Sequence, residues 1–314
     1  MATWVELSNE VETLAIQQKG IWFKTRLTET LADISRIRNT NVLFYFSGFL
    51  QKNGPFGSLS HEDINGFMSG LCGMDWSKPL TLLLHTPGGS PTAAQSVMEY
   101  LRTKFSHIEA IVPAMAMSAG TMMCLCADHI VLGNHSQLGP IDPQMLVNGR
   151  YVSAGAILTQ FEEAKKEILK NGAVAPAWFP ILNFLGPSLC VEAAQAIDFG
   201  KSIVAQWLEN FMYKSHPNRT QRASETADYF SRNDLHLNHG RRIGKTEARS
   251  LEMSVEDLEA DHNFQEAVLT AYHLGTILCS QTATVKFINT DQGNLWLKNI
   301  AIPQPQQPGM LTEE

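Results

Sequence analysis

Residues 111–144, IVPAMAMSAGTMMCLCADHIVLGNHSQLGPIDPQ, place Ser118 at a turn between an apolar run typical of a strand and one typical of a core helix. Alanine and glycine lie close to Ser118 on both sides, so a substrate backbone can approach its hydroxyl. A serine at such a turn also lies beside the free N–H groups of a helix N-terminus, which favour a developing anion. The pattern predicts a serine nucleophile of acyl-transfer chemistry, although a small residue that only lets a strand pack on a helix has the same pattern.

A glycine pair upstream favours the catalytic interpretation. In LTLLLHTPGGSPTAAQSV, residues 80–97, a short apolar strand is followed by Gly88 and Gly89, and a helix begins near Ala93. Adjacent glycines allow backbone conformations that other residues avoid, and they let N–H groups face a ligand. We therefore expect Gly88 or Gly89 to give one donor of an oxyanion hole and Ala119 the other. Neither glycine spacing of the common phosphate loops is present.

These motifs resemble a known family. TPGG, MSAGTMMCLCADHIVLG and LGPIDPQ are similar to the ClpP-class serine peptidases, and most similar to the SppA-like branch called serine dehydrogenase proteinases. The similarity continues more weakly through residues 238–243, NHGRRI, and the following KTEARSLEMSVEDL. It implies an α/β fold, the ClpP/crotonase-like spiral of strand-strand-helix units, with Ser118 as the nucleophile. It also implies peptidase activity without a metal or organic cofactor, and homo-oligomers that hide the active sites.

The chain differs from ClpP in the residue that would activate Ser118. In ClpP a histidine follows the nucleophilic serine after a short interval, but here that window, residues 139–144 (GPIDPQ), contains none. Asp142, which lies in this window, is expected to help shape the site. The SppA-like branch implies a lysine general base instead, and such a base needs a desolvated amine with a lowered pKa.

Two adjacent lysines are candidates for that base, and helical phasing separates them. They lie in GAILTQFEEAKKEILKN, where apolar residues recur at the spacing of one helix face. Lys165 follows Phe161 by four residues and precedes Ile168 by three, so it projects from that face. Lys166 projects from the polar side. We expect Lys165 to be the base and keep Lys166 as the alternative. A lysine that extends from a half-buried helix to water has the same spacing.

Histidines offer further candidates for the base. His85 ends the strand before TPGG, where it reaches the cleft or forms part of its wall. His239 lies in the NHGRR turn, where it completes the site or only fixes the loop. Neither an H-E-x-x-H motif nor paired C-x-x-C spacing occurs, so we expect no zinc site.

Composition and charge limit the classes of partner. A net charge of −7 argues against nucleic acid binding, which normally needs a basic surface. The five cysteines are an odd number without framework spacing, so we expect a reducing, cytoplasmic setting. The first residues carry acidic side chains and lack the apolar region of a signal peptide. The uncharged run 111–127 divides better into a strand and a core helix than into a membrane span, because Pro113 and the serine turn interrupt it.

Four regions are expected along the chain. They are an N-terminal helical extension (residues 1–37), a ClpP/SppA-like peptidase core (38–280), a C-terminal β-hairpin (281–302) and a disordered tail rich in proline and glutamine (303–314). Within the core, the apolar segment 172–189 is interrupted by three prolines. We expect it to be a buried arm, a subunit contact or the wall of a substrate groove.

The sequence as a whole predicts a serine endopeptidase that forms an acyl-enzyme on Ser118. Four methionines close to Ser118 favour apolar peptide substrates, and the glycine-rich loop 47–60 covers the cleft or lies on the surface. Two alternatives belong to other classes. One is a crotonase-type acyl-CoA enzyme, which needs a basic CoA patch. The other is a catalytically silent peptide-binding or scaffold subunit. The natural substrate, the ring size and any ATPase partner stay open.

Overall fold

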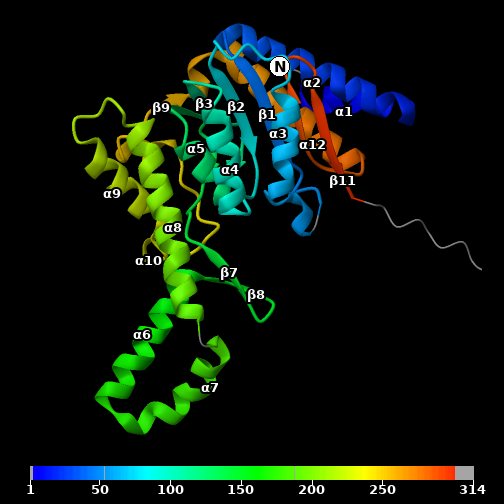
Figure 1. The fold of residues 1–314 in the computed structure, drawn as a ribbon. Coiled ribbons are helices and arrows are strands. Elements are labelled where there is room, and N and C mark those ends of the chain that lie inside the picture. The colour runs from blue at the N-terminus through cyan, green and yellow to red at the C-terminus, as the bar shows by residue number, and fades with distance from the viewer. Residues whose placement is uncertain (1–2, 53, 187, 301–314) are drawn as a thin grey trace, which may run out of the picture.

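The protein consists of a body built around one large sheet and an arm of helices that extends from the body (Figure 1). The computed structural model describes residues 3–52, 54–186 and 188–300, so the tail expected at 303–314 lies outside it. Most strands of the large sheet are parallel, and helices cover both of its faces. The α/β class expected from the sequence is therefore confirmed.

The strands are short, and most of them belong to the body. In chain order they are β1 (Asn41–Ser47), β2 (Leu80–His85), β3 (Ile108–Val112), β4 (Met115–Ala116), β5 (His129–Leu132), β6 (Gln137–Leu138), β7 (Gln144–Val147), β8 (Arg150–Ser153), β9 (Val255–Asp257), β10 (Thr284–Thr290) and β11 (Leu295–Asn299).

The α-helices alternate with the strands through most of the body and dominate the arm. In chain order they are α1 (Trp4–Glu12), α2 (Ile16–Arg38), α3 (Ile64–Gly70), α4 (Pro91–Arg102), α5 (Ala119–Leu125), α6 (Ala154–Lys170), α7 (Ala175–Leu185), α8 (Leu189–Asn210), α9 (Arg219–Ser231), α10 (Asn233–His236), α11 (Lys245–Ser250) and α12 (His262–Gln281).

The large sheet has seven strands in the order β11-β10-β1-β2-β3-β5-β9. The five strands from β1 to β9 in this order are parallel, while β10 is antiparallel to β1 and pairs with β11 as a hairpin at the edge. Carboxyl ends of parallel strands meet at one edge of a sheet. The segments that follow β2 and β3, which carry the glycine pair and Ser118, therefore leave the sheet side by side.

Side chains of the central strands alternate between two apolar cores. Leu43 and Tyr45 of β1 join the core beneath α3, α4 and α5, whereas Phe44 and Phe46 join the core beneath α2 and α12. Every residue of β1 and β2 is buried, as is typical of strands covered by helices on both faces. His85, the last residue of β2, is buried on the same face as Phe46, with which it pairs.

A small second sheet lies beyond the carboxyl ends of β2 and β3. It consists of β4 and β6, which run parallel, with Ala116 opposite Leu138. Isolated bridges extend it on both sides, because Thr86 pairs with Ala116 and Leu138 pairs with Ile243. Three distant segments of the chain are thereby brought to the strand that leads into Ser118.

The arm contains the β7–β8 hairpin, α6, α7 and the first part of α8 (Figure 1). Its core is small, and it includes Ala154, Ile157 and Ala164 of α6 and Ala193 of α8. Helix α7 is 11 residues long and contains Pro180 in its interior. None of its residues is buried. The expectation that this apolar segment is a buried arm is therefore wrong for the chain by itself, while a subunit contact and a groove wall remain as interpretations.

Within the described residues, no single helix has both the length and the apolar content to cross a bilayer. Two consecutive segments, Gly172–Leu185 and Leu189–Asn210, are long and apolar enough only when they are taken together. Their axes are bent by 61° with respect to each other.

Candidate active site

Ser118 lies at a tight turn between β4 and α5 and has an unusual backbone conformation. Its φ of 52° and ψ of −119° lie outside the regions that a non-glycine residue prefers. Helix α5 begins at the next residue and is held by the Ser118 carbonyl, which accepts from the Met122 N–H at 3.0 Å. A strained serine between a strand and a helix presents its hydroxyl at the head of the turn, which is also the geometry of the nucleophile in α/β-hydrolases. Ser118 itself is half-buried and so remains accessible.

The glycine turn after β2 packs directly against this serine turn. A Cβ added at Gly88 would lie 2.5 Å from the Met117 carbonyl oxygen and 2.8 Å from Ser118 Cβ. The φ of Gly88 is +89° and that of Gly89 is +147°, both of which L side chains rarely adopt. Only glycine at these positions lets the two turns approach so closely.

The free backbone donors beside Ser118 can be identified from the hydrogen bonds around them. The Gly88 N–H is engaged, because it donates to Thr86 Oγ1 at 3.1 Å. Among the described residues, neither the Gly89 N–H nor the Ala119 N–H donates to a partner. The sequence left Gly88 and Gly89 as alternatives for the first oxyanion donor, and this pattern favours Gly89 together with Ala119.

Asp142 and His239 form a pair although they are far apart in the sequence. His239 Nδ1 lies 2.7 Å from Asp142 Oδ1, and Gln144 Nε2 donates to Asp142 Oδ2 at 2.7 Å. Asp142 is buried, while the His239 side chain is partly exposed. Because Nδ1 faces the carboxylate, Nε2 is the ring nitrogen that is left for a second partner.

Backbone pairing connects the segments of this histidine–aspartate pair to the strand that leads into Ser118. Leu138 pairs in parallel with Ala116 on one side and antiparallel with Ile243 on the other. Asp142 is four residues after Leu138 and His239 is four residues before Ile243, so the pair lies one short segment beyond this bridge on each strand. Through Leu138, both segments are connected to the strand that leads into Ser118.

His85 is on the opposite side of the sheet and has an apolar environment. Its ring centroid is 4.7 Å from that of Phe46, 5.1 Å from that of Phe49 and 5.0 Å from that of Tyr272. Burial lowers the pKa of His85 to about 3, so the ring stays neutral at ordinary pH. These contacts make His85 part of the wall behind the glycine turn, which was one of the two roles expected for it.

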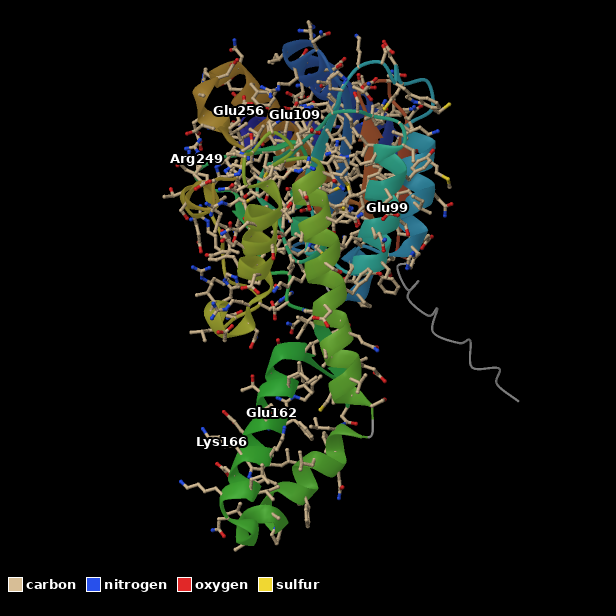
Figure 2. All side chains as sticks on the ribbon, turned by 60° about the vertical axis from the view of Figure 1, so that its left-hand side comes forward. Glu99, Glu109, Glu162, Lys166, Arg249 and Glu256 are labelled. Atoms are coloured by element: carbon tan, nitrogen blue, oxygen red, sulfur yellow. The ribbon has the colours of Figure 1, made fainter. Side chains whose placement is uncertain are left out.

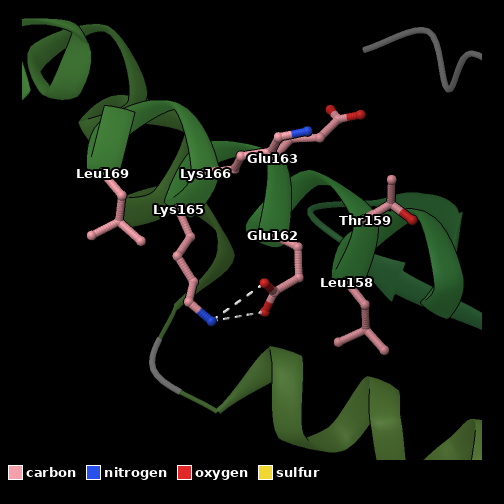
Figure 3. Close-up of a pocket in the computed structure, with 7 residues that line it drawn as sticks. All are labelled: Leu158, Thr159, Glu162, Glu163, Lys165, Lys166 and Leu169. Carbon is pink, nitrogen blue, oxygen red and sulfur yellow. Dashed lines mark hydrogen bonds and ion pairs between the residues drawn. The ribbon is translucent and has the colours of Figure 1, made fainter. Parts of the chain in front are cut away.

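Lys165 and Lys166 lie on α6 in the arm, and both side chains are exposed. The Lys165 side chain is 57% exposed, and its Nζ lies 3.3 Å from Glu162 Oε2 (Figure 3). In Figure 2, Lys166 and Glu162 lie on the arm, well away from Glu109 in the body. Helical phasing assigned Lys165 to an apolar face, and in this chain that face is largely open to solvent. The described residues therefore do not provide the desolvation that a lysine base requires.

The methionines near Ser118 are mostly core residues. Met117, Met122 and Met123 are buried, and the Met117 side chain fills the space beside Gly139. Their packing removes the reason for expecting apolar substrates from these residues.

Leu59 is a residue near the site that sequence reasoning did not single out. Its N–H donates to the Gly88 carbonyl at 2.7 Å, and its carbonyl accepts from the Ser90 N–H at 2.9 Å. Residues 47–60 were expected to cover the cleft or to form a surface loop. The end of this loop instead pairs with the glycine turn, and a signal for this was Leu59, an apolar residue between Ser58 and Ser60.

One cluster of side chains in the described part of the chain has the composition of a metal site. Ligand atoms of Glu109, His129 and Glu256 lie within 4.8 Å of one another. Arg38 already neutralises them, because its Nε lies 3.1 Å from Glu109 Oε1 and its Nη1 lies 2.8 Å from Glu256 Oε1. We therefore interpret the cluster as an ion-pair network at the amino ends of β3, β5 and β9.

Comparisons with known proteins show similarity in the part of the chain that contains Ser118. Residues 59–173, which contain the glycine turn, Ser118 and Asp142, match the family model described as ClpP-like SDH-type serine proteinase. Two uncharacterized proteins of Methanocaldococcus jannaschii are similar to the chain. MJ0137 is 32% identical over 37% of this chain and 42% of its own length. MJ1495 is 32% identical over 28% of this chain and 29% of its own. The chain thus spans less than half the length of these curated relatives.

A solved structure also aligns with the chain. It is a mutant of the 1510-N membrane-bound stomatin-specific protease, at 17% identity over 63% of this chain and 74% of that one. The TM-score of 0.38 is too low to support an argument about shared geometry.

Proposed function

We propose that this chain hydrolyses peptide bonds through an acyl-enzyme on Ser118, and the match of residues 59–173 to the ClpP-like serine proteinase model supports this proposal. The observation that carries the proposal is the strained Ser118 turn, which lies close to two free backbone donors and is connected through Leu138 to the segments of Asp142 and His239. The order serine, aspartate, histidine along the chain is one of several in which this set of residues occurs in hydrolases.

Each group has a defined role in the proposed reaction. Ser118 Oγ attacks the substrate carbonyl while its proton moves to His239 Nε2, and Asp142 orients the ring and stabilises the imidazolium. The Gly89 and Ala119 N–H groups bond the oxyanion. His239 then protonates the leaving amine, and a water molecule repeats the sequence to release the acyl group. Gln144 supports the second oxygen of Asp142 at 2.7 Å.

The rival proposal retains the lysine general base. In this version Lys165, or Lys166, acts on Ser118 after α6 has been covered by another subunit. The amine would then become desolvated, as a lysine base requires. The two proposals make opposite predictions for substitutions at His239 and Lys165.

Covalent labelling with a fluorophosphonate, followed by intact mass, tests the proposal and separates these bases. We expect one adduct on the wild type and none on Ser118→Ala. Labelling of His239→Gln should be slower by ~10³-fold or more, and Asp142→Asn should also be strongly impaired. Lys165→Met should label at the wild-type rate.

The opposite pattern would select the rival base. Fast labelling of His239→Gln together with slow labelling of Lys165→Met would support the lysine dyad. A folded wild type that gives neither adduct nor peptide turnover would favour the catalytically silent scaffold. If CoA thioesters raised its melting temperature, the acyl-CoA alternative would be favoured instead.

We also propose that the chain forms homo-oligomers and that the arm supplies part of the contact. The arm exposes large apolar side chains from three elements, among them Phe161 of α6, Phe179 and Phe184 of α7, and Val191 of α8. Exposed apolar groups at this density are typical of surfaces that associate. A second copy of the chain is the occupant that the expected oligomer requires.

A further inference from the structure

A buried ion pair lies beneath the loop that holds the glycine turn. Lys286 Nζ of β10 lies 2.6 Å from Asp63 Oδ1 and 2.8 Å from Asp63 Oδ2. The side chains of Lys286 and Asp63 are 3% and 0% exposed. Tyr45 adds a third member, because its hydroxyl donates to Asp63 Oδ2 at 3.0 Å. We call Lys286, Asp63 and Tyr45 the buried polar cluster.

The cluster reaches the active site first through the backbone of the loop. Lys286 Nζ donates to the Ser58 carbonyl at 2.9 Å, and Asp63 Oδ2 accepts from the Ser60 N–H at 2.9 Å. These two bonds fix the residues on both sides of Leu59. Leu59 in turn pairs with the carbonyl of Gly88 and the N–H of Ser90, so it holds the glycine turn from both ends.

A second connection runs through Thr86. Burial and then the Asp63 charge raise the pKa of Tyr45, whereas Thr86 lowers it. Thr86 Oγ1 also accepts from the Gly88 N–H at 3.1 Å, and the Thr86 backbone pairs with Met115 and Met117. Thr86 thus lies between the buried polar cluster and both turns, the one with Gly88 and the one with Ser118.

Stability alone is a weak reason for such a pair. Removing two charges from water costs as much as their attraction returns, and well-packed apolar replacements are often no less stable. The hydrogen bonds of Lys286 and Asp63 are directed at particular backbone groups, which an apolar pair could not hold. The cluster therefore serves better to fix the position of the loop than to raise the stability of the fold.

We propose that Lys286, Asp63 and Tyr45 are positioning residues that hold Leu59 against the glycine turn and so aim the Gly89 N–H at the oxyanion. This inference rests on the proposed serine peptidase function for its catalytic part. None of the three contacts the substrate. They act through Leu59 and Thr86, so they should affect the transition state more than substrate binding.

The first test is the double variant Lys286→Met/Asp63→Asn in the full-length protein. It removes both charges together, so neither is left buried without a partner. The asparagine oxygen can still accept from Ser60 and Tyr45, but Ser58 loses its donor. We expect kcat to fall by about 10- to 100-fold with KM within about threefold. Affinity for a peptide boronate should fall in parallel with kcat, while affinity for a product peptide should not change.

A matched control is available on the neighbouring strand. Lys298 Nζ lies 2.6 Å from Glu62 Oε2, but this pair is solvent-exposed. We expect Lys298→Met/Glu62→Gln to leave kcat and the boronate affinity within about twofold of the wild type. Tyr45→Phe, which keeps the ion pair intact, serves as a second variant in case the double variant does not fold. We expect it to lower kcat with little change in KM.

Amide hydrogen exchange gives a readout that does not depend on activity. The N–H groups of Leu59 and Ser90 donate the two hydrogen bonds that join Leu59 to the glycine turn. Peptides that cover them should therefore exchange faster in the cluster variants than in the control. Unchanged exchange and unchanged kcat in a folded cluster variant would overturn the proposal. A wild type without turnover or fluorophosphonate adduct would refute the peptidase function, and faster exchange at Leu59 and Ser90 would still support the structural part.

Discussion

Helices α5 and α7 are both short and apolar, yet they have opposite environments. All seven residues of α5 are buried between the sheet and α4 and α8, and none of the 11 residues of α7 is buried. The body around α5 is closely packed, since there is no room for a side chain at Gly88, where the glycine turn meets the Ser118 turn. The arm around α7 is open, and its apolar side chains face solvent.

The difference separates two uses of apolar sequence. In the body, burial fixes the geometry of a strained serine and its backbone donors, as catalysis by preorganised groups requires. In the arm, the same kind of residue has no partner within the chain, so it is available for contact with another molecule. Substitutions in the body should therefore change stability and chemistry, whereas those in the arm should change association.

The largest effect on stability is expected for Arg38→Met in the body. Arg38 neutralises Glu109, which is 3% exposed and has no other fully charged partner in the described residues. Removing the guanidinium leaves a buried carboxylate uncompensated, which typically costs about 3–5 kcal/mol. Urea unfolding followed by circular dichroism measures the change.

The control for this prediction is the exposed ion pair of the arm. Lys165→Met removes the Lys165–Glu162 pair, and we expect less than about 0.5 kcal/mol, because exposed pairs contribute little. Equal losses for Arg38→Met and Lys165→Met would contradict the distinction between the two regions.

The second prediction concerns acid unfolding of the body. Burial raises the pKa of Glu109, but hydrogen bonds from His129, Arg38 and Thr81 outweigh it and lower the pKa from 4.5 to about 2. A carboxyl whose pKa is lower in the folded state stabilises the fold above its unfolded pKa. That contribution is lost as pH falls through the folded pKa. We expect a loss of roughly 3 kcal/mol between about pH 5 and pH 2, at 1.36 kcal/mol per unit.

The matched variant for the acid prediction is Glu109→Gln, which has no carboxyl to titrate. Its stability should fall less steeply than that of the wild type over the same pH range. Parallel curves for the two proteins would show that other groups cause acid unfolding.

The third prediction compares two glycines, one in each region. An added Cβ at Gly88 would lie 2.5 Å from the Met117 carbonyl oxygen, at a φ of +89°, whereas nothing lies within 4 Å at Gly172 in the arm. We expect Gly88→Ala to cost about 2 kcal/mol or more and to lower kcat about 100-fold, because the oxyanion donor moves. Gly172→Ala should be neutral in both. Thermal unfolding and peptide turnover measure the two effects, and a fully active Gly88→Ala would argue against the glycine turn as the oxyanion site.

The sequence was most informative where the signal is local. Ser118, the glycine pair and Ala119 were singled out because a strand, a turn and a helix follow one another within a few residues. The sheet confirms the α/β class that the sequence predicted, and residues 59–173 match the ClpP-like family model. The roles of the individual site residues stay predictions.

The long-range pairs could not be predicted in the same way. Asp142 and His239 are 97 residues apart, and Asp63 and Lys286 are 223 apart, so each meeting depends on how distant strands pair. Helical phasing identified the face of α6 that carries Lys165. It could not predict whether another part of the molecule packs on that face, because the periodicity of one helix carries no information about its packing partner.

The smallest effect on stability and the clearest effect on assembly are expected in the arm. Phe184 of α7 is 65% exposed, so Phe184→Glu should change the free energy of unfolding by less than about 0.5 kcal/mol. A charge at an apolar subunit contact should nonetheless weaken association. We expect a lower oligomeric state in sedimentation velocity, with the same secondary structure by circular dichroism.

Ile21 on α2 provides the control, because it is 72% exposed on the body. If Ile21→Glu leaves the oligomer intact while Phe184→Glu dissociates it, the contact belongs to the arm and not to exposed apolar residues in general. The root of the arm begins at Gln144, which bonds the carboxylate of Asp142. Dissociation should therefore also lower kcat in Phe184→Glu if subunit contacts fix the arm and, through Gln144, the proposed catalytic residue Asp142. Unchanged kcat in the dissociated protein would show instead that the body holds its active site without help from the arm.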